Sequence, residues 1–244
     1  RSDLAVFTSE GRAIRVHVSD LPTGSLKSPF SASQADEYLG LSSEEVIGIS
    51  DWLSTDTFAV GTRNGTVKRF EGPLPDRAEV IFISLKDDDS CLSVTECPPG
   101  SEVFFVTSAG NLLVFGADAV RAQGLTAGGM QGISAADSRA IAFGLAGKTD
   151  VLVTASNSSQ ALGSTHAGSI KLTPLSNFPR KGRATQGVRC HRFLKGEDQL
   201  YYAGSASEYP TVVNLSGATI ALPDLDERRD SSGSPAADYV GFSF

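Results

Sequence analysis

Val103-Phe-Phe-Val-Thr-Ser-Ala-Gly110-Asn-Leu-Leu-Val-Phe115 decides the fold of this chain, because it reads as two apolar runs joined by a short turn. The runs are rich in β-branched and aromatic residues, and the turn holds glycine, which adopts positive φ without strain. The stretch therefore predicts an antiparallel β-hairpin.

The same strand, turn and strand design recurs along the sequence. Its turns are Thr8-Ser-Glu-Gly11-Arg12, Thr62-Arg-Asn-Gly65-Thr66, Thr107-Ser-Ala-Gly110-Asn111 and Thr165-His-Ala-Gly168-Ser169. The turn glycines lie 54, 45 and 58 residues apart. A period of about 50 residues in an all-β chain is typical of a propeller-like array, because one small sheet cannot bury its faces alone.

The repeats divide the chain into five units within one domain, residues 1–244. The units span approximately residues 4–49, 51–94, 102–143, 149–193 and 198–244. Inside the last unit, 224–235 reads as a polar linker, and Tyr239–Phe244 reads as a strand that returns to the fold. A returning strand of this kind would remove an exposed sheet edge.

The composition fits a globular domain with many short strands. The chain has 244 residues, 40% of them hydrophobic and 20% charged, with 25 glycines and 11 prolines. No apolar run approaches the roughly 20 residues that a membrane-spanning helix needs. The chain begins at Arg1 without a methionine, so we expect it to be a fragment of a longer protein.

The cysteines and histidines point to no disulfide framework and no metal site. Cys91, Cys97 and Cys190 form an odd and scattered set, which fits a reducing cytoplasm. Cys190 and His191 are adjacent, but their spacing matches no zinc pattern. No nucleophile stands at a recognisable spacing from a histidine, so no catalytic residue is predicted.

The charge is acidic in total and basic in one place. The net charge is −7 and the isoelectric point is about 5.0, which taken alone argues against a nucleic-acid partner. Residues 180–195, however, hold six cations and no acid. A local basic stripe can bind phosphates on an acidic body, because screening limits the field to about 10 Å.

A motif near this stripe carries a family resemblance. Gly168 opens a basic strand, Phe178-Pro179 follows, and Arg180-Lys-Gly-Arg-Ala-Thr-Gln-Gly187 closes as a glycine-containing loop. This order resembles the repeat of the C-terminal domains of bacterial type IIA topoisomerase A subunits, those of DNA gyrase and topoisomerase IV. Residues 188–198 and 124–133 look most like the topoisomerase IV subunit of actinobacterial type.

The resemblance implies a five-bladed β-pinwheel, a propeller-like ring of four-stranded antiparallel blades that exchange strands with their neighbours. It implies binding and bending of double-stranded DNA without sequence specificity, and presentation of that DNA for ATP-dependent strand passage, decatenation and relaxation. It also implies that the catalytic residues lie outside this chain. The cofactors ATP and Mg²⁺ would serve the full enzyme, and this domain would hold none.

The expected partners are duplex DNA, the ATPase B subunit and the remainder of the A subunit, with no membrane partner. The expected location is the cytoplasm, at the bacterial nucleoid. Gyrase A subunits carry a Gln-Arg-Arg-Gly-Gly-Lys-Gly box, and residues 180–187 of this chain are a degenerate form of it. This departure favours topoisomerase IV over the alternative, a gyrase wrapping domain.

The candidate DNA-binding residues are the cations that follow the turns and those of the basic stripe. They are Arg12, Arg15, Arg63, Lys68, Arg69, Arg121, Lys171, Arg180, Lys181, Arg183, Arg189 and Arg192. The third unit has Leu113 and Val114 where the second has Lys68 and Arg69, so a basic ring would be interrupted there.

Two other classes of function stay open at this point. The chain could be a propeller that scaffolds proteins, with acidic patches docking a basic partner. It could also be an enzyme with a site at the centre of the ring, although no constellation of residues supports one.

Overall fold

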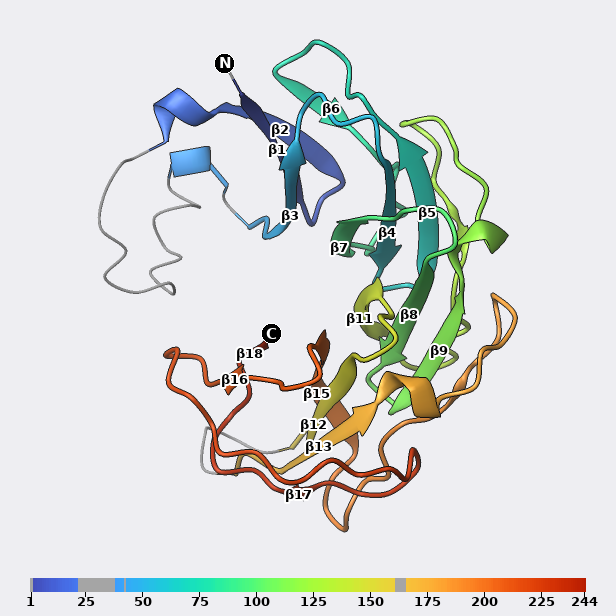
Figure 1. The fold of residues 1–244 in the computed structure, drawn as a ribbon, viewed down its shortest axis with the longest axis vertical. Coiled ribbons are helices and arrows are strands. Elements are labelled where there is room, and N and C mark those ends of the chain that lie inside the picture. Colours follow the sequence, from blue (N-terminus) through green and yellow to red (C-terminus); the bar gives the residue numbers. More distant parts are fainter. Residues whose placement is uncertain (1, 22–37, 42, 161–165) are drawn as a thin grey trace.

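The computed structural model describes residues 2–21, 38–41, 43–160 and 166–244, and in them the fold is all-β (Figure 1). Four four-stranded antiparallel sheets, the blades, follow one another around an arc. A fifth, two-stranded sheet ends the series. Single-turn 3₁₀ helices follow the hairpins of blades 1, 3 and 4, at η1 (Val18–Asp20), η2 (Ala117–Ala119) and η3 (Leu175–Asn177).

Each complete blade has the same strand order from its inner edge to its outer edge. Blade 1 is β3 (Val46–Asp51), β1 (Asp3–Thr8), β2 (Arg12–His17) and β6 (Glu79–Ile81). Blade 2 is β7 (Cys91–Glu96), β4 (Thr57–Thr62), β5 (Thr66–Glu71) and β10 (Met130–Gln131). Blade 3 is β11 (Ala140–Leu145), β8 (Glu102–Thr107), β9 (Asn111–Gly116) and β14 (Val188–Arg189). Blade 4 is β15 (Gln199–Ala206), β12 (Val151–Asn157), β13 (Ser169–Pro174) and β17 (Ser234–Pro235).

The predicted hairpin around Gly110 is confirmed, with Val103 paired to Phe115 and Val106 paired to Leu112. Gly110 adopts a φ of 83°, and Gly11 and Gly65 adopt 84° and 83° in the equivalent turns. An L-residue is strained at such angles, so the turn requires glycine at this place.

The blades exchange strands, because the outer strand of each comes from the following unit. The register is the same in all four blades: the residue two positions after the turn glycine pairs with the donated strand. The pairs are Ala13 with Val80, Val67 with Met130, Leu112 with Val188, and Ile170 with Ser234. Sequence units and blades therefore do not coincide: the second and third units each build three strands of their own blade and one of the previous blade, and the fifth unit supplies both β15 and β17 of blade 4.

The cores lie between blades. Phe104 and Phe105 are neighbours on β8, and the alternation of a strand sends them to opposite faces. Phe105 packs in the core between blades 2 and 3, and Phe104 packs in the core between blades 3 and 4. Both residues are at most 2% exposed. The middle strands β8 and β12 are buried on both faces, and this explains why Val103–Val106 of β8 reads as a continuous apolar run.

The fifth unit differs from what the sequence predicts. Its first strand, β15, joins blade 4, and only β16 (Val212–Val213) and β18 (Phe242–Ser243), with a further bridge from Val213 to Thr219, form a sheet of its own instead of a complete four-stranded blade. The expected linker 224–235 in fact donates β17 to blade 4. The expected returning strand at the end of the chain is β18, and it pairs inside its own unit.

Candidate nucleic-acid interface

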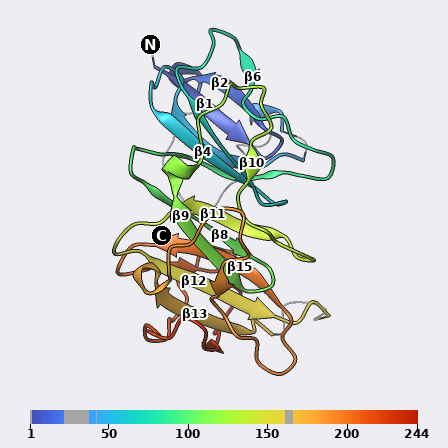
Figure 2. The ribbon, with the colours of Figure 1, turned by 90° about the vertical axis from the view of Figure 1, so that its right-hand side faces the viewer.

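The strand exchange lays one segment of each following unit along the outer edge of a blade. We call these segments crossing loops; they span residues 72–81, 120–131, 178–189 and 226–235, on blades 1 to 4 in turn. Figure 2 faces the outer side of the arc and shows β6, β10, β9 and β13 along it. A duplex lying against the convex side of the arc would meet these loops first.

The crossing loops differ sharply in charge. The first holds Asp76, Arg77 and Glu79, and the second holds Arg121 as its one charged residue. The fourth mixes two arginines with Asp226, Glu227 and Asp230. The third, 178–189, holds four cations and no acid: Arg180, Lys181, Arg183 and Arg189. The positive charge of the outer edge is therefore concentrated on blade 3.

The third crossing loop runs beside β9 from Asn111 to Val114. Arg180 bridges to Val114 in the middle of the strand, and Arg189 pairs with Asn111 at its start. The side chains of Lys181 and Arg189 are exposed, and no ion pair to them is found in the part of the chain that the structure describes. Arg183 is half-buried and donates from Nη1 to the carbonyl oxygen of Gln131 at 2.5 Å.

Arg180, in contrast, is held in the protein. Its Nε and Nη2 donate to the carboxylate of Glu102 at 2.9 and 2.7 Å, and its Nη1 donates to the carbonyls of Leu175 and Phe178. The hydrogen bonds from Arg180 lower the pKa of Glu102. The Arg180 side chain is 33% exposed, so the guanidinium anchors the start of the crossing loop on blade 3.

Just beyond this loop the chain offers two more exposed cations, Arg192 and Lys195. Arg192 is among the residues predicted from the sequence. Lys195 belongs to the same acid-free stretch, and that signal could have placed it among the candidates. Neither side chain has an acidic partner within the described ranges.

Arg12 and Arg15 are both engaged with acids. Arg12 donates from Nε to both oxygens of Glu44 at 2.8 and 2.9 Å and from Nη1 to Glu79 at 2.9 Å. Arg15 pairs with Asp76 and Asp3 and lies over the Trp52 ring, 5.5 Å from its centroid. The acids raise the pKa of each guanidinium, Glu44 foremost for Arg12 and Asp76 foremost for Arg15.

Lys68 and Lys171 cannot contact phosphate in this structure, so their assignment to the DNA-binding set is wrong. Their relative exposures are 0% and 2%. Lys68 Nζ donates to the carbonyls of Phe82, Leu125 and Ala127 at 2.7, 2.7 and 2.9 Å. Lys171 Nζ donates to those of Cys190 and Arg229 at 2.9 and 2.7 Å. Burial lowers the pKa of both to about 8, so both remain charged at neutral pH.

These two lysines anchor the crossing loops through hydrogen bonds to backbone carbonyls. Each one is the third residue after a turn glycine, and each binds the carbonyl that follows a donated outer strand. In blade 3 this position is Leu113, and the equivalent carbonyl, of Gly132, accepts the backbone N–H of Ala184 at 2.7 Å instead. Ala184 reaches it with a φ of 67°. In blade 3, a backbone N–H of the third crossing loop thus takes the place of the lysine ammonium.

Arg69 is also held inside. Its side chain is 13% exposed, and Nη1 donates to the carbonyls of Ala117 and Val120 and to Asp118, all between 3.1 and 3.2 Å. Arg63, in the β4–β5 turn, and Arg121, in the second crossing loop, are exposed. The structure therefore leaves Arg63, Arg121, Lys181, Arg183, Arg189 and Arg192 as the predicted cations able to face a ligand.

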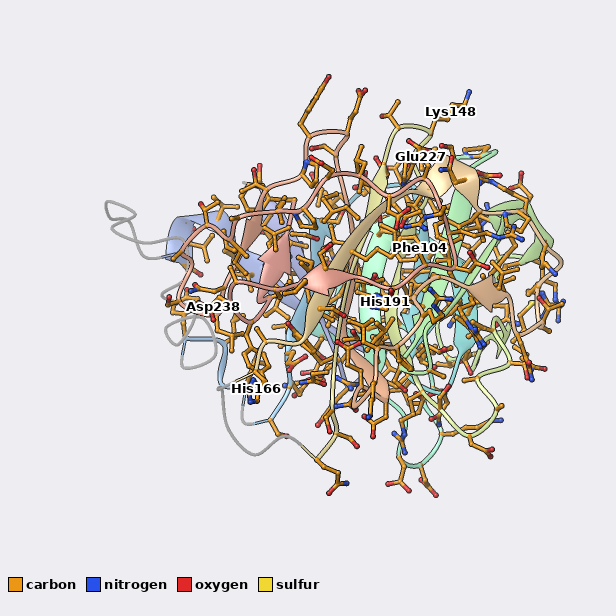
Figure 3. All side chains as sticks on the ribbon, turned by 90° about the horizontal axis from the view of Figure 1, so that it is seen from below. Phe104, Lys148, His166, His191, Glu227 and Asp238 are labelled. Carbon is orange, nitrogen blue, oxygen red and sulfur yellow. The ribbon has the colours of Figure 1, made fainter. Side chains whose placement is uncertain are left out.

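The buried polar cluster around His191 looks at first like a chemical site. His191 is 1% exposed; its Nδ1 lies 2.9 Å from Thr154 Oγ1, and its Nε2 lies 3.1 Å from Ser156 Oγ. Ser156 and Ser169 both donate to Glu197. Figure 3 shows His191 among the ribbons and away from the margin. Because the cluster is enclosed, it holds the segment after β14 against blade 4 and offers no access to a substrate.

The three cysteines are free and buried. Among the described residues, no helix is long and apolar enough to cross a membrane, and no group of three or more His, Cys, Asp or Glu side chains is placed to hold a metal ion.

Small four-stranded sheets, each completed by a strand of the next repeat, define the class of propeller-like β-pinwheels. A family model described as the DNA gyrase C-terminal domain, β-propeller, matches residues 2–25, 101–156 and 163–199. The DNA gyrase A chain of Salmonella typhimurium is 30% identical over 190 residues, which is 75% of this chain and 20% of that protein. The gyrase A chain of Mycobacterium tuberculosis strain H37Rv is 26% identical over 194 residues, 75% of this chain and 22% of its own length.

Two solved structures share the fold. The C-terminal domain of DNA topoisomerase IV has a TM-score of 0.79 at 23% identity, with 100% of this chain and 78% of that chain covered. The DNA gyrase A C-terminal domain has a TM-score of 0.71 at 18% identity, with 99% and 81% covered. The chain belongs to the family of C-terminal β-pinwheel domains of type IIA topoisomerase A subunits. It spans about a fifth of the length of the two gyrase proteins, at 20% and 22%.

Proposed function

We propose that this domain binds double-stranded DNA without reading its sequence, and that the third crossing loop is the centre of contact. The observation that supports this most is the set of exposed cations on and after that loop, Lys181, Arg189 and Arg192, with no acid in residues 180–195. Lysine and arginine contacts to phosphate give affinity and position, and they carry no sequence information by themselves.

The contact is focal in this proposal. Arg121 and Arg63 add charge on blade 2, next to the basic loop. The outer edges of blades 1 and 4 carry acids, and Arg12 and Arg15 of blade 1 are already paired with Glu44, Glu79 and Asp76. Bending a site of 20–30 base pairs costs roughly 1–6 kcal/mol, which a few phosphate contacts can offset. We therefore expect a local bend over blades 2 and 3 instead of a wrap around all blades.

In the whole protein the domain would present a DNA segment for ATP-dependent strand passage, and it would have no catalytic activity alone. The ATPase B subunit and the remainder of the A subunit would be its protein partners. ATP and Mg²⁺ would act outside this domain. The site of action would be the bacterial nucleoid in the cytoplasm.

Within the family we favour the topoisomerase IV subunit, of actinobacterial type, over the gyrase subunit. One observation supports this choice: the box at 180–187 is degenerate. A gyrase A domain should wrap DNA with a defined hand. Supercoiling of a relaxed plasmid by the reconstituted holoenzyme would contradict the topoisomerase IV assignment.

The DNA-binding proposal is tested by fluorescence anisotropy on two unrelated duplexes over a series of salt concentrations. Binding through about four phosphates gives a slope of log K against log salt near −4. Replacing Lys181, Arg189 and Arg192 by Ala should flatten the slope by about 3 on both duplexes. The matched control replaces Arg77, Lys86 and Lys148, which are exposed cations outside residues 180–195.

Equal losses of DNA affinity in the two triple variants would contradict a contact centred on the third crossing loop. If the parent domain failed to bind DNA at low salt, the alternative of a protein-interaction scaffold would be favoured, since an acidic scaffold passes through a DNA-cellulose column.

A further inference from the structure

The fifth unit contains the same turn as the first three units, although its sequence differs. Gly217 adopts a φ of 85°, and its N–H donates to the carbonyl of Asn214 at 3.0 Å. Gly65 and Gly110 make the same bond to Thr62 and Thr107. The side chain of Asn214 accepts the N–H of Ala218, as the threonine hydroxyls accept the N–H after the turn glycine. Residues 214–220 are therefore the hairpin of a fifth blade.

The second strand of this hairpin is hydrogen-bonded to β16 along one edge, and its other edge has no partner among the described residues. Asn214 N–H donates to the carbonyl of Ala218, and Ile220 N–H donates to the carbonyl of Val212. Residues 218 and 220 thus direct their backbone groups toward β16, and the N–H and C=O of Thr219 point the opposite way. Across the part of the chain that the structure describes, no strand pairs with Thr219 on that side.

Four blades show what belongs at this edge. Thr219 lies two positions after its turn glycine, as do Ala13, Val67, Leu112 and Ile170, and each of those four pairs with a donated outer strand. The turn glycine carbonyl also accepts an N–H from beyond that strand: Gly11 from Phe82, Gly65 from Ile133, Gly110 from Cys190 and Gly168 from Ala236. The carbonyl of Gly217 has no such partner among the described residues.

The sequence of the edge does not protect it. Residues 217–222, Gly-Ala-Thr-Ile-Ala-Leu, carry no charge, and Ala218, Thr219 and Ala221 are exposed. Edge strands that stay unpaired are commonly blunted by charged side chains or by proline, and residues 217–222 contain neither. An uncharged, exposed edge with unpaired backbone groups is suited to β-strand addition.

We propose that the outer edge of the fifth hairpin, at Gly217–Ala221, is a docking site for an extended protein strand that adds antiparallel to Thr219. The occupant has the pattern shared by three of the donated strands: a glycine directly before the two paired residues and a small residue after them. Gly129, Gly187 and Gly233 hold the first position, and Gly132, Cys190 and Ala236 hold the last. The site is separate from the basic crossing loop and does not depend on DNA binding.

The test appends a second copy of residues 128–136, which carry no charge, to the end of the chain through a flexible Gly/Ser linker. Such a linker gives an effective concentration in the millimolar range. Amide hydrogen exchange is then measured for each residue. We expect exchange at Thr219 and Ala221 to slow by about tenfold or more, and exchange at Val67, in blade 2, to stay unchanged.

The control carries Met130→Pro in the appended copy only, which removes the N–H that would face Thr219 and should restore fast exchange. Unchanged exchange at Thr219 with the native copy would overturn the proposal. Slow exchange in the parent chain that depends on protein concentration would also overturn it, and would make a second copy of this chain the occupant.

Discussion

Replacing Lys68 by Met separates the two roles that a cation after a turn glycine can have. If Lys68 holds the crossing loop, as its burial indicates, Lys68→Met should lower the free energy of unfolding and leave DNA affinity unchanged. If it contacts phosphate, the variant should lose DNA affinity and keep its stability.

The size of the effect follows from the three carbonyls that Nζ contacts at 2.7, 2.7 and 2.9 Å. The bond to Phe82 is buried, and those to Leu125 and Ala127 are partly buried. A buried acceptor without a donor costs about 1–3 kcal/mol, and water can still reach the two partly buried ones. The variant also loses the desolvation penalty of the buried ammonium, and this offsets part of the loss in stability. We therefore expect a net loss of about 2–3 kcal/mol.

The assay is urea unfolding followed by circular dichroism, together with anisotropy on a duplex at fixed salt. At a slope of about 1–3 kcal/mol per molar urea, the midpoint should fall by about 1 M. Lys171→Met should behave in the same way. Arg63→Ala, an exposed position on the same hairpin as Lys68, is the control for stability. The reasoning is refuted if Lys68→Met unfolds like the parent and binds DNA more weakly.

Three further predictions follow from the packing of the blades. Arg180→Ala breaks the ion pair with Glu102, but both side chains are about a third exposed, so urea unfolding should show a loss of at most about 1 kcal/mol in the free energy of unfolding. The same substitution should lower DNA affinity less than Arg189→Ala does. Gly61→Ala would place a Cβ 2.2 Å from Cγ of Phe143, so thermal unfolding should show a lower midpoint, and an unchanged one would contradict this close approach of β4 and β11. Burial lowers the pKa of His191 from 6.5 to about 4, so on acidification the unfolded chain is protonated at this histidine before the folded protein is. The free energy of unfolding should therefore fall by up to about 3 kcal/mol as the pH drops from 6.5 to 4. His191→Gln should flatten that part of the pH profile of stability, and replacing the exposed His166 should not.

Much of the fold could be predicted because its signals are local. A β-branched run, a glycine turn and a second run specify a hairpin within a dozen residues, and the hairpin predicted at Gly110 is present. The fifth hairpin was harder to recognise, because Asn214 replaces the threonine and only the hydrogen bond to Ala218 shows that it has the same role.

The sequence by itself determined the repeated hairpins, the family resemblance and the basic stretch 180–195, since each of these lies in contiguous residues. Only the tertiary structure decided which cations are available to a ligand. Lys68 and Lys181 are both lysines of a basic segment, yet one is 0% exposed and the other is on the surface. The difference arises because the segment that covers Lys68 comes from residues more than 50 positions later in the chain, and only folding brings the two together.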